Sequence, residues 1–171
     1  VNNKAITPSD KISKVSPTNL KEIDSKFTIP LYDFYAAAGS FSEIQSNKDY
    51  SQIEVEEKYA KSGNYFACKV IGESMNRRIP NGSICIFRKI GDGTKNGKIV
   101  LVENRDTQDP DFNSAFTVKT YSSQKKVTEF GVENVQIILK PNSYDRSYVD
   151  IVLDEENAEG MIVHAEFVAI I

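Results

Sequence analysis

The sequence has few of the residues that crosslink a small fold or bind a metal. Its 171 residues include two cysteines, Cys68 and Cys85, and one histidine, His164. Each cysteine lies in an apolar, strand-like run, so we expect buried thiols in a reducing compartment and neither a disulfide nor a zinc site. His164 has no partner at metal-ligand spacing, and a Ser-His-Asp triad would have to use it. The sequence therefore predicts no cofactor, no metal and a histidine on one face of a strand.

The chain also lacks an excess of positive charge and a long apolar run. Its 21 basic and 24 acidic residues give a formal net charge of −3, whereas a domain that grips phosphates usually has a basic face. No run approaches the roughly 18 apolar residues of a membrane span, and no signal peptide opens the chain. We therefore expect a cytoplasmic protein that contacts no membrane.

Two segments differ in composition. Residues 1–28 are rich in Lys, Ser, Thr, Asn and Pro and have no sustained apolar period, so we expect a linker or flexible tail there. Residues 29–171 are expected to form one globular domain. The first residue is Val1 and not Met, which favours a piece of a longer protein.

Short runs rich in Val, Ile, Phe and Tyr follow one another from Ile29 to the end of the chain. Turn-forming residues separate them at a spacing of about ten residues, which is typical of antiparallel strands. The fold class predicted is mostly β, with bent antiparallel sheets and few short helices, and the one helical candidate lies at 74–78. The expected strands are 29–35, 51–57, 65–72, 83–89, 98–104, 115–121, 135–140, 148–153 and 161–171.

A serine that could act as a nucleophile lies at the end of a predicted strand. Ser74 is in the segment Gly72-Glu73-Ser74-Met75, directly after the apolar run 66–71. A serine there can point its hydroxyl into a groove, and the backbone N–H groups of Ser74 and Met75 can face a developing oxyanion. Most serines in such places only cap or form a turn. On its own this feature predicts no chemistry.

A lysine lies in the middle of another predicted strand. Alternation places Thr117, Lys119 and Tyr121 on one face of the run 115–121. Such a lysine is usually at a sheet edge with its ammonium in water. Burial would instead disfavour the charged ammonium and leave a neutral amine able to deprotonate a serine. Lowering a lysine pKa from about 10.4 to about 7 costs roughly 4–5 kcal/mol, which the fold must supply.

A small-residue segment, 36–40, follows the first predicted strand. Its sequence is Ala-Ala-Ala-Gly-Ser. Small residues on both sides of the Ala38–Gly39 bond would let the backbone enter a narrow catalytic slot, and Gly39 permits a sharp reversal. A plain turn is the simpler interpretation of this segment alone.

Taken in order, these three features resemble the LexA, UmuD and phage repressor group of self-cleaving regulators. In that family an Ala–Gly or Cys–Gly bond precedes a Gly-x-Ser-Met nucleophile motif, and a Val-Lys strand supplies the general base. Here Ser74 in GESM follows Ala38 by 36 residues, and Lys119 in VK follows Ser74 by 45. The resemblance covers residues 29–171 and includes the segments IPNGSICIFRK, NGKIVLVEN and ILKPNSYD.

The resemblance implies a LexA-like peptidase domain whose substrate is its own cleavage loop, around 36–40. Lys119 would deprotonate Ser74, Ser74 would attack Ala38, and the N–H groups of Ser74 and Met75 would stabilise the oxyanion. The resemblance also implies a homodimer through the C-terminal strand 164–171 and a RecA-type activator of an SOS response. DNA contact would come only through a domain absent from this chain.

One departure from the family concerns the interval between serine and lysine, which is longer than in LexA itself. The extra length falls in the polar segment 105–114, which we expect to be a loop. Long loops of this kind resemble peptidase domains attached to restriction- or helicase-associated proteins. The regulator could thus belong to a transcriptional, stress, phage or restriction system, and a DNA-operator-binding domain before residue 1 is not implied by every variant.

Three rival functions stay open from the sequence. A non-cleaving dimerisation or regulatory module would keep the fold without the reaction, although the intact Ser74, Lys119 and Ala38–Gly39 set argues against such decay. A signal-peptidase-like enzyme would need a membrane anchor and an external substrate. A sugar- or nucleotide-binding β-barrel has no Gly-rich phosphate loop to support it.

Overall fold

The fold is built almost entirely from strands. The computed structural model describes residues 12–13, 27–33, 41, 43, 50–104, 115–154 and 156–171. Among these residues no helix reaches seven residues, which confirms the mostly β prediction. The elements are β1 (Ile12–Ser13), β2 (Thr28–Tyr32), β3 (Ser51–Glu54), α2 (Glu57–Ala60), β4 (Tyr65–Val70), β5 (Ser83–Lys89), β6 (Ile99–Asn104), β7 (Phe116–Thr128), β8 (Gly131–Lys140), β9 (Ile151–Leu153) and β10 (Met161–Ile170). No helix in this described part could span a bilayer.

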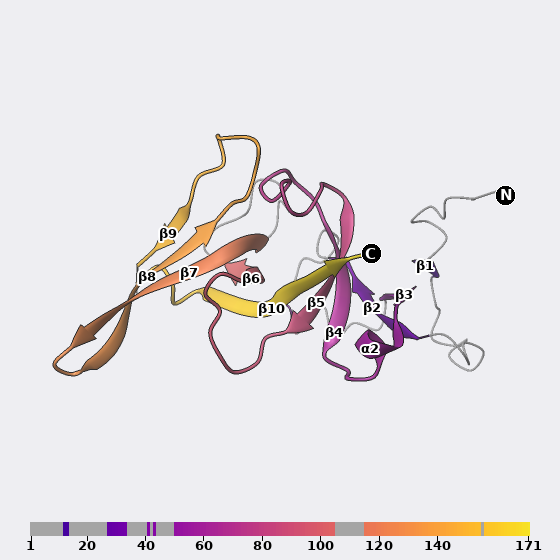
Figure 1. Ribbon diagram of the computed structural model, residues 1–171, viewed down its shortest axis with the longest axis horizontal. Coiled ribbons are helices and arrows are strands. Elements are labelled where there is room, and N and C mark those ends of the chain that lie inside the picture. Colours follow the sequence, from indigo (N-terminus) through magenta and orange to yellow (C-terminus); the bar gives the residue numbers. More distant parts are fainter. Residues whose placement is uncertain are drawn as a thin grey trace.

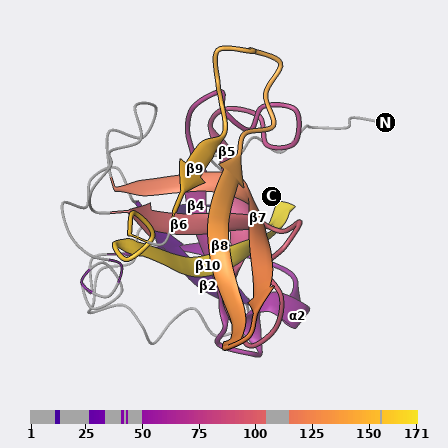
Figure 2. The same ribbon diagram turned by 90° about the vertical axis from the view of Figure 1, so that its left-hand side faces the viewer.

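The strands form one continuous, strongly bent sheet in the order β1-β3-β2-β4-β5-β10-β6-β7-β8-β9. Figure 1 shows β2, β3 and β4 at one end and β7, β8 and β9 at the other. Seen from the side in Figure 2, β8 runs steeply across the direction of β6 and β10. Such a bend follows from the accumulated right-handed twist of neighbouring strands.

One pair of neighbours departs from the antiparallel pattern expected from the sequence. Strands β2 and β4 pair in parallel, with Leu31 opposite Ala67 and Tyr32 opposite Cys68. A parallel pair needs a crossover of a dozen or more residues, and the chain between β2 and β4 includes β3 and the short helix α2. The sequence analysis, which expected antiparallel sheets, did not predict this one parallel pair, because periodicity carries no information on strand direction.

The β7–β8 hairpin is longer than the two runs that the sequence predicted. Strand β7 continues to Thr128 and β8 already begins at Gly131, whereas the expected strands were 115–121 and 135–140. Residues near the tip are largely polar, so their side chains give no apolar alternation, and the ladder of backbone pairs carries the strand onward. At the tip the Phe130 side chain is 96% exposed.

The sheet buries both of its faces at β6. Leu101 packs in a hydrophobic cluster with Phe66, Met75 and Phe116, while Val100 and Val102 pack in a second cluster with Leu139 and Leu153. A strand covered on both faces reads as a continuous apolar run, as IVLV does here. Strand β6 therefore lies at the centre of the domain, beside the strand that carries Lys119.

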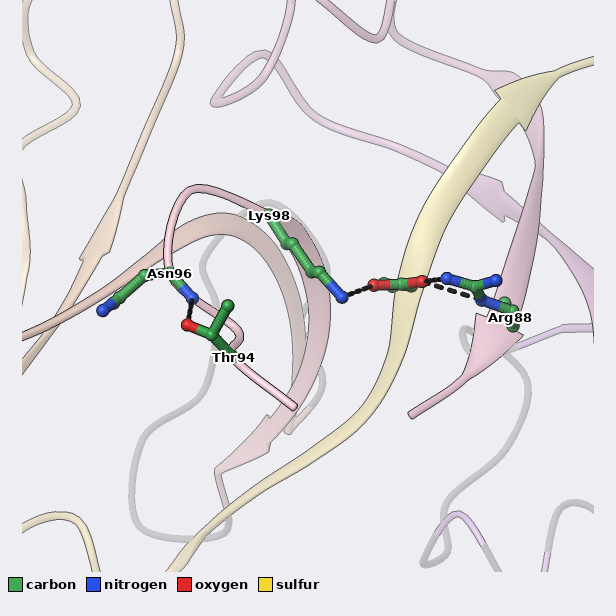
Figure 3. Close-up of polar contacts among 5 residues, drawn as sticks. Arg88, Thr94, Asn96 and Lys98 are labelled. Atoms are coloured by element: carbon green, nitrogen blue, oxygen red, sulfur yellow. Dashed lines mark hydrogen bonds and ion pairs between the residues drawn. The ribbon is translucent and has the colours of Figure 1, made fainter. Parts of the chain in front are cut away.

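An ion-pair network ties β5, β10 and the segment before β6. The Glu166 carboxylate accepts hydrogen bonds from Arg88 and from Lys98, the latter at 2.6 Å. Figure 3 shows Arg88 and Lys98 approaching this carboxylate from opposite sides, and a nearby turn in which the Asn96 N–H donates to the Thr94 hydroxyl. These contacts join the three segments through one buried carboxylate.

Two further points concern local structure. Strand β1 lies within 1–28, the segment for which the sequence predicted a linker or flexible tail, and pairs with β3. Residues 74–78 form hydrogen-bonded turns and not the expected short helix, whereas the helix α2 was not predicted. Both segments are too short for a hydrophobic period to show whether they form a turn or a helix.

Candidate active site

Ser74 lies in a tight turn that leaves β4. Gly72 has a φ of 102°, a backbone conformation that side chains disfavour, and its N–H donates to Asn81 Oδ1 at 3.0 Å. This reversal carries the chain back over the sheet, where the Ser74 side chain is only 6% exposed. The nucleophile candidate is therefore inside the domain and not at a surface turn.

The turn that carries Ser74 is held by backbone hydrogen bonds and by two buried apolar side chains. The Met75 carbonyl accepts hydrogen bonds from the N–H groups of Arg78 at 2.9 Å and Ile79 at 2.7 Å. The side chains of Met75 and Ile79 are buried in the core cluster. Across the described ranges, no hydrogen bond uses the N–H of Ser74 or Met75. Those two donors are the pair named from the sequence for an oxyanion.

Lys119 lies on β7 opposite Val100 of β6. Its side chain is 4% exposed, and its Nζ lies 2.9 Å from Ser74 Oγ. The structure thus brings together the two side chains that the sequence named as nucleophile and base.

Thr117 is a neighbour of Lys119 that sequence reasoning did not include in the site. Its hydroxyl oxygen lies 2.7 Å from Lys119 Nζ, and its side chain is also buried. Alternation along the strand had already placed Thr117 on the lysine face, so the signal was present. The amine is therefore held between two hydroxyl groups, those of Ser74 and Thr117.

The connection after β8 braces the nucleophile turn. The Asn142 N–H donates to the Ser74 carbonyl at 2.8 Å, and the Arg77 N–H donates to the Asn142 carbonyl at 3.1 Å. The Tyr144 N–H donates to Asn76 Oδ1 at 2.9 Å. The Arg77 guanidinium lies 5.0 Å from the centre of the Tyr144 ring. Because the contacts to Ser74 are made by backbone atoms, the side-chain pattern of the sequence does not predict them.

The predicted scissile bond, Ala38–Gly39, lies outside the described residues, as does the polar segment 105–114. Phe41, three residues after Ala38, is described and buried in the core cluster. The first described residue after the predicted cleavage segment is therefore part of the core.

The remaining reactive side chains lie apart from this pair. Cys68 and Cys85 face each other across β4 and β5 as free, buried thiols. Burial raises the pKa of the Cys68 thiol well above its usual range and that of Cys85 to about 12. The imidazole of His164 contacts Glu103 at 2.6 Å. No group of three metal-ligating side chains occurs in the part of the chain that the structure describes.

The comparison with protein families agrees with the class that this fold and site indicate, a serine peptidase domain. The family model described as Peptidase S24-like matches residues 30–164. The chain belongs to this family, which is that of the LexA, UmuD and phage repressor self-cleaving serine peptidases, and the resemblance is confirmed. The comparison with curated proteins found no match.

Proposed function

We propose that this domain is an autoproteolytic peptidase in which Ser74 and Lys119 cut the chain's own Ala38–Gly39 bond. The observation that carries the proposal is the 2.9 Å separation of Lys119 Nζ and Ser74 Oγ, with both side chains buried. A nucleophile and a base within hydrogen-bond reach are the minimum that covalent catalysis requires.

The reaction begins when the neutral Lys119 amine takes the proton of the Ser74 hydroxyl. The oxygen then bonds to the Ala38 carbonyl carbon, and the electron pair of the carbonyl moves onto its oxygen. The N–H groups of Ser74 and Met75 donate to that oxyanion. The C–N bond to Gly39 breaks, the leaving amine takes the proton from Lys119, and an ester joins Ala38 to Ser74. Water, deprotonated by the same amine, hydrolyses the ester and restores Ser74.

Burial is the physical basis of the base in this proposal. A lysine that titrates near pH 7 and not at about 10.4 costs roughly 4–5 kcal/mol of folding free energy. The packing of the two hydrophobic clusters that hold β6 and β7 must supply that free energy. The substrate is part of the same chain, so its effective concentration is high, and docking of the loop controls the rate.

The test is self-cleavage at alkaline pH, followed by intact-mass spectrometry. The proposal predicts fragments 1–38 and 39–171, and no fragments from Ser74→Ala or Lys119→Ala. Ser83→Ala and Lys140→Ala are matched controls, because these residues lie outside the pair and should cleave like the wild type. Cleavage that persists in Ser74→Ala or Lys119→Ala would refute the pair, and a wild-type chain that stays whole would favour the non-cleaving module.

We also propose that the domain forms a homodimer through the end of β10. Residues Ala165–Ile170 pair with β5, but β6 pairs only as far as Glu166. The side chains of Val168 and Ile170 are partly exposed on this strand. A second copy could therefore cover the end of the strand. Sedimentation equilibrium should show a dimer for the wild type and a monomer for Val168→Glu; equal masses would overturn the contact.

The regulatory setting is proposed from family membership alone. Cleavage would separate the peptidase domain from an upstream DNA-associated domain, on a signal such as a RecA-type filament. Addition of an activated filament to the full-length protein should then accelerate cleavage. An unchanged rate would show that such a filament does not trigger cleavage.

A further inference from the structure

A buried carboxylate and the single histidine lie beside the first described residue after the predicted cleavage segment. Glu103, on β6, is 2% exposed. Its Oε2 lies 2.6 Å from Nε2 of His164, on β10, and accepts the backbone N–H of Phe41 at 3.4 Å. The Phe41 ring stacks on the imidazole, with centroids 4.2 Å apart and planes 19° from parallel. One carboxylate thus contacts both the backbone of Phe41 and the ring that supports its side chain.

A β-bulge directs His164 toward this position. The register of β10 against β6 shifts between Val163, opposite Val102, and Ala165, opposite Leu101. Val163 packs with one hydrophobic cluster and Ala165 with the other, although regular alternation would place both on one face. The extra residue in the bulge therefore shifts the alternation, so that Val163 and Ala165 lie on opposite faces of the sheet. Bulges commonly redirect a side chain in this way.

Two further aromatic rings lie close to that of Phe41. Its centroid lies 5.5 Å from that of Phe66 and 6.5 Å from that of Phe116. Phe116 lies directly opposite Glu103 in the β6–β7 ladder. Tilted rings at these separations attract one another beyond their simple burial. The side chain of Phe41 therefore occupies an aromatic socket, with the Glu103–His164 pair beside it.

We propose that Glu103 and His164 are positioning residues that anchor the leaving-group side of the scissile bond through Phe41. The inference rests on the proposed cleavage at Ala38–Gly39. Three residues of extended chain span at most about 10 Å, so a fixed Phe41 keeps the Ala38 carbonyl within about that distance. With Phe41 fixed, the scissile bond is linked to the core by a short segment, which raises its effective concentration at Ser74.

The socket also sets a side-chain preference at the third residue after the cut. An aromatic ring at this position can stack on the imidazole and also contact the Phe66 and Phe116 rings. A small side chain would leave the socket unfilled. After cleavage, the fragment that begins at Gly39 keeps Phe41 in the socket.

The experiment measures two rates on the whole chain. The first is self-cleavage, and the second is labelling of Ser74 by a small fluorophosphonate, which needs the Ser74 and Lys119 pair but no docked loop. Glu103→Ala and Phe41→Ala should each slow cleavage at least tenfold and leave labelling as fast as in the wild type or faster. Glu103→Gln keeps an oxygen acceptor for the Phe41 N–H and should cleave within about threefold of the wild-type rate.

Glu166→Ala is the matched control, because it also removes a buried glutamate but lies in the ion-pair network away from Phe41. It should cleave and label like the wild type. Cleavage within twofold of wild type in Glu103→Ala and Phe41→Ala would overturn the inference. A parallel fall of cleavage and labelling, with a lower melting temperature, would also overturn it by assigning a merely structural role. A wild-type chain that is neither cleaved nor labelled would overturn the proposed function, and this inference with it.

Discussion

The backbone N–H of Asn142 donates to the carbonyl of Ser74 at 2.8 Å. The connection after β8 is thereby joined to the turn that carries the nucleophile candidate, far away in sequence. The Asn142 side chain is exposed, so the contact depends on the backbone at this position and not on the asparagine side chain.

Asn142→Pro removes that donor, whereas Asn142→Ala keeps it. The proline variant should lose about 1–3 kcal/mol of unfolding free energy, because the buried Ser74 carbonyl is left without its partner. We expect it to cleave at least tenfold more slowly, since the turn would no longer hold Ser74 against Lys119. Urea denaturation and the mass-spectrometric assay measure the two effects. If the alanine variant were as impaired as the proline variant, the brace would reside in the side chain.

Thr117→Val replaces the second hydroxyl beside Lys119 with a methyl group of similar size. Its loss should lower the alkaline plateau of the cleavage rate about tenfold, which is less than the roughly 10²–10⁴-fold of a group that transfers the proton itself, because the hydroxyl only orients the amine. Thr120→Val, on the same strand but on the other face, is the control and should keep the wild-type plateau. A plateau unchanged in Thr117→Val would show that the hydroxyl does not orient the amine.

Glu166 gives a prediction on pH and stability. Its hydrogen bond with Lys98, followed by its contacts with Arg88, lowers the Glu166 pKa. A carboxylate with a lowered pKa in the folded state stabilises the fold above its unfolded pKa, and the contribution disappears as the pH falls through the folded pKa. The two cations are partly exposed, so solvent screening keeps the effect at about 1 kcal/mol or less.

Glu166→Gln should therefore melt at a lower temperature than the wild type at pH 7, and this difference should vanish toward pH 3. Salt at 1 M should shrink the difference at pH 7, since screening weakens partly exposed pairs. A difference that persists undiminished at pH 3 would contradict a charge-based role for Glu166.

The two thiols should resist alkylation in the native state. Burial raises the pKa of Cys85 to about 12 and raises that of Cys68 as well, so the reactive thiolate is scarce at pH 8. Mass spectrometry should detect no iodoacetamide adduct on native protein and two adducts after denaturation. Rapid native labelling would show that the β4–β5 region opens. Because these groups ionise more readily when unfolded, stability should fall as the pH rises above about 9, and the cleavage assay is best kept below that value.

The sequence predicted the parts of this protein that depend on side-chain pattern. Val118 and Lys119 lie on a strand with clear alternation, and the turn at Ser74 follows an apolar run that ends at glycine. The mostly β fold and the family followed from such local signals, and both are confirmed.

Other features depend on backbone pairing that side chains do not record. The polar residues of the β7–β8 hairpin gave no period, and the parallel partner of β2 was not visible. The bulge at His164 reverses alternation within one strand, so a residue expected on a simple strand face meets Glu103 and Phe41. A charged residue inside the apolar run IVLVEN was the one signal that could have pointed to that buried pair.

The most direct test of the central claim is an NMR titration of the Lys119 side chain, in protein with ¹⁵N-labelled lysine. The Ser74→Ala background keeps the chain whole during the measurement, and Lys119→Ala identifies the resonance. We predict that the amine titrates at least two pH units below the ordinary lysine value of about 10.4. Titration at or above that value would mean that Lys119 is an ammonium at working pH, and it would contradict its role as the base.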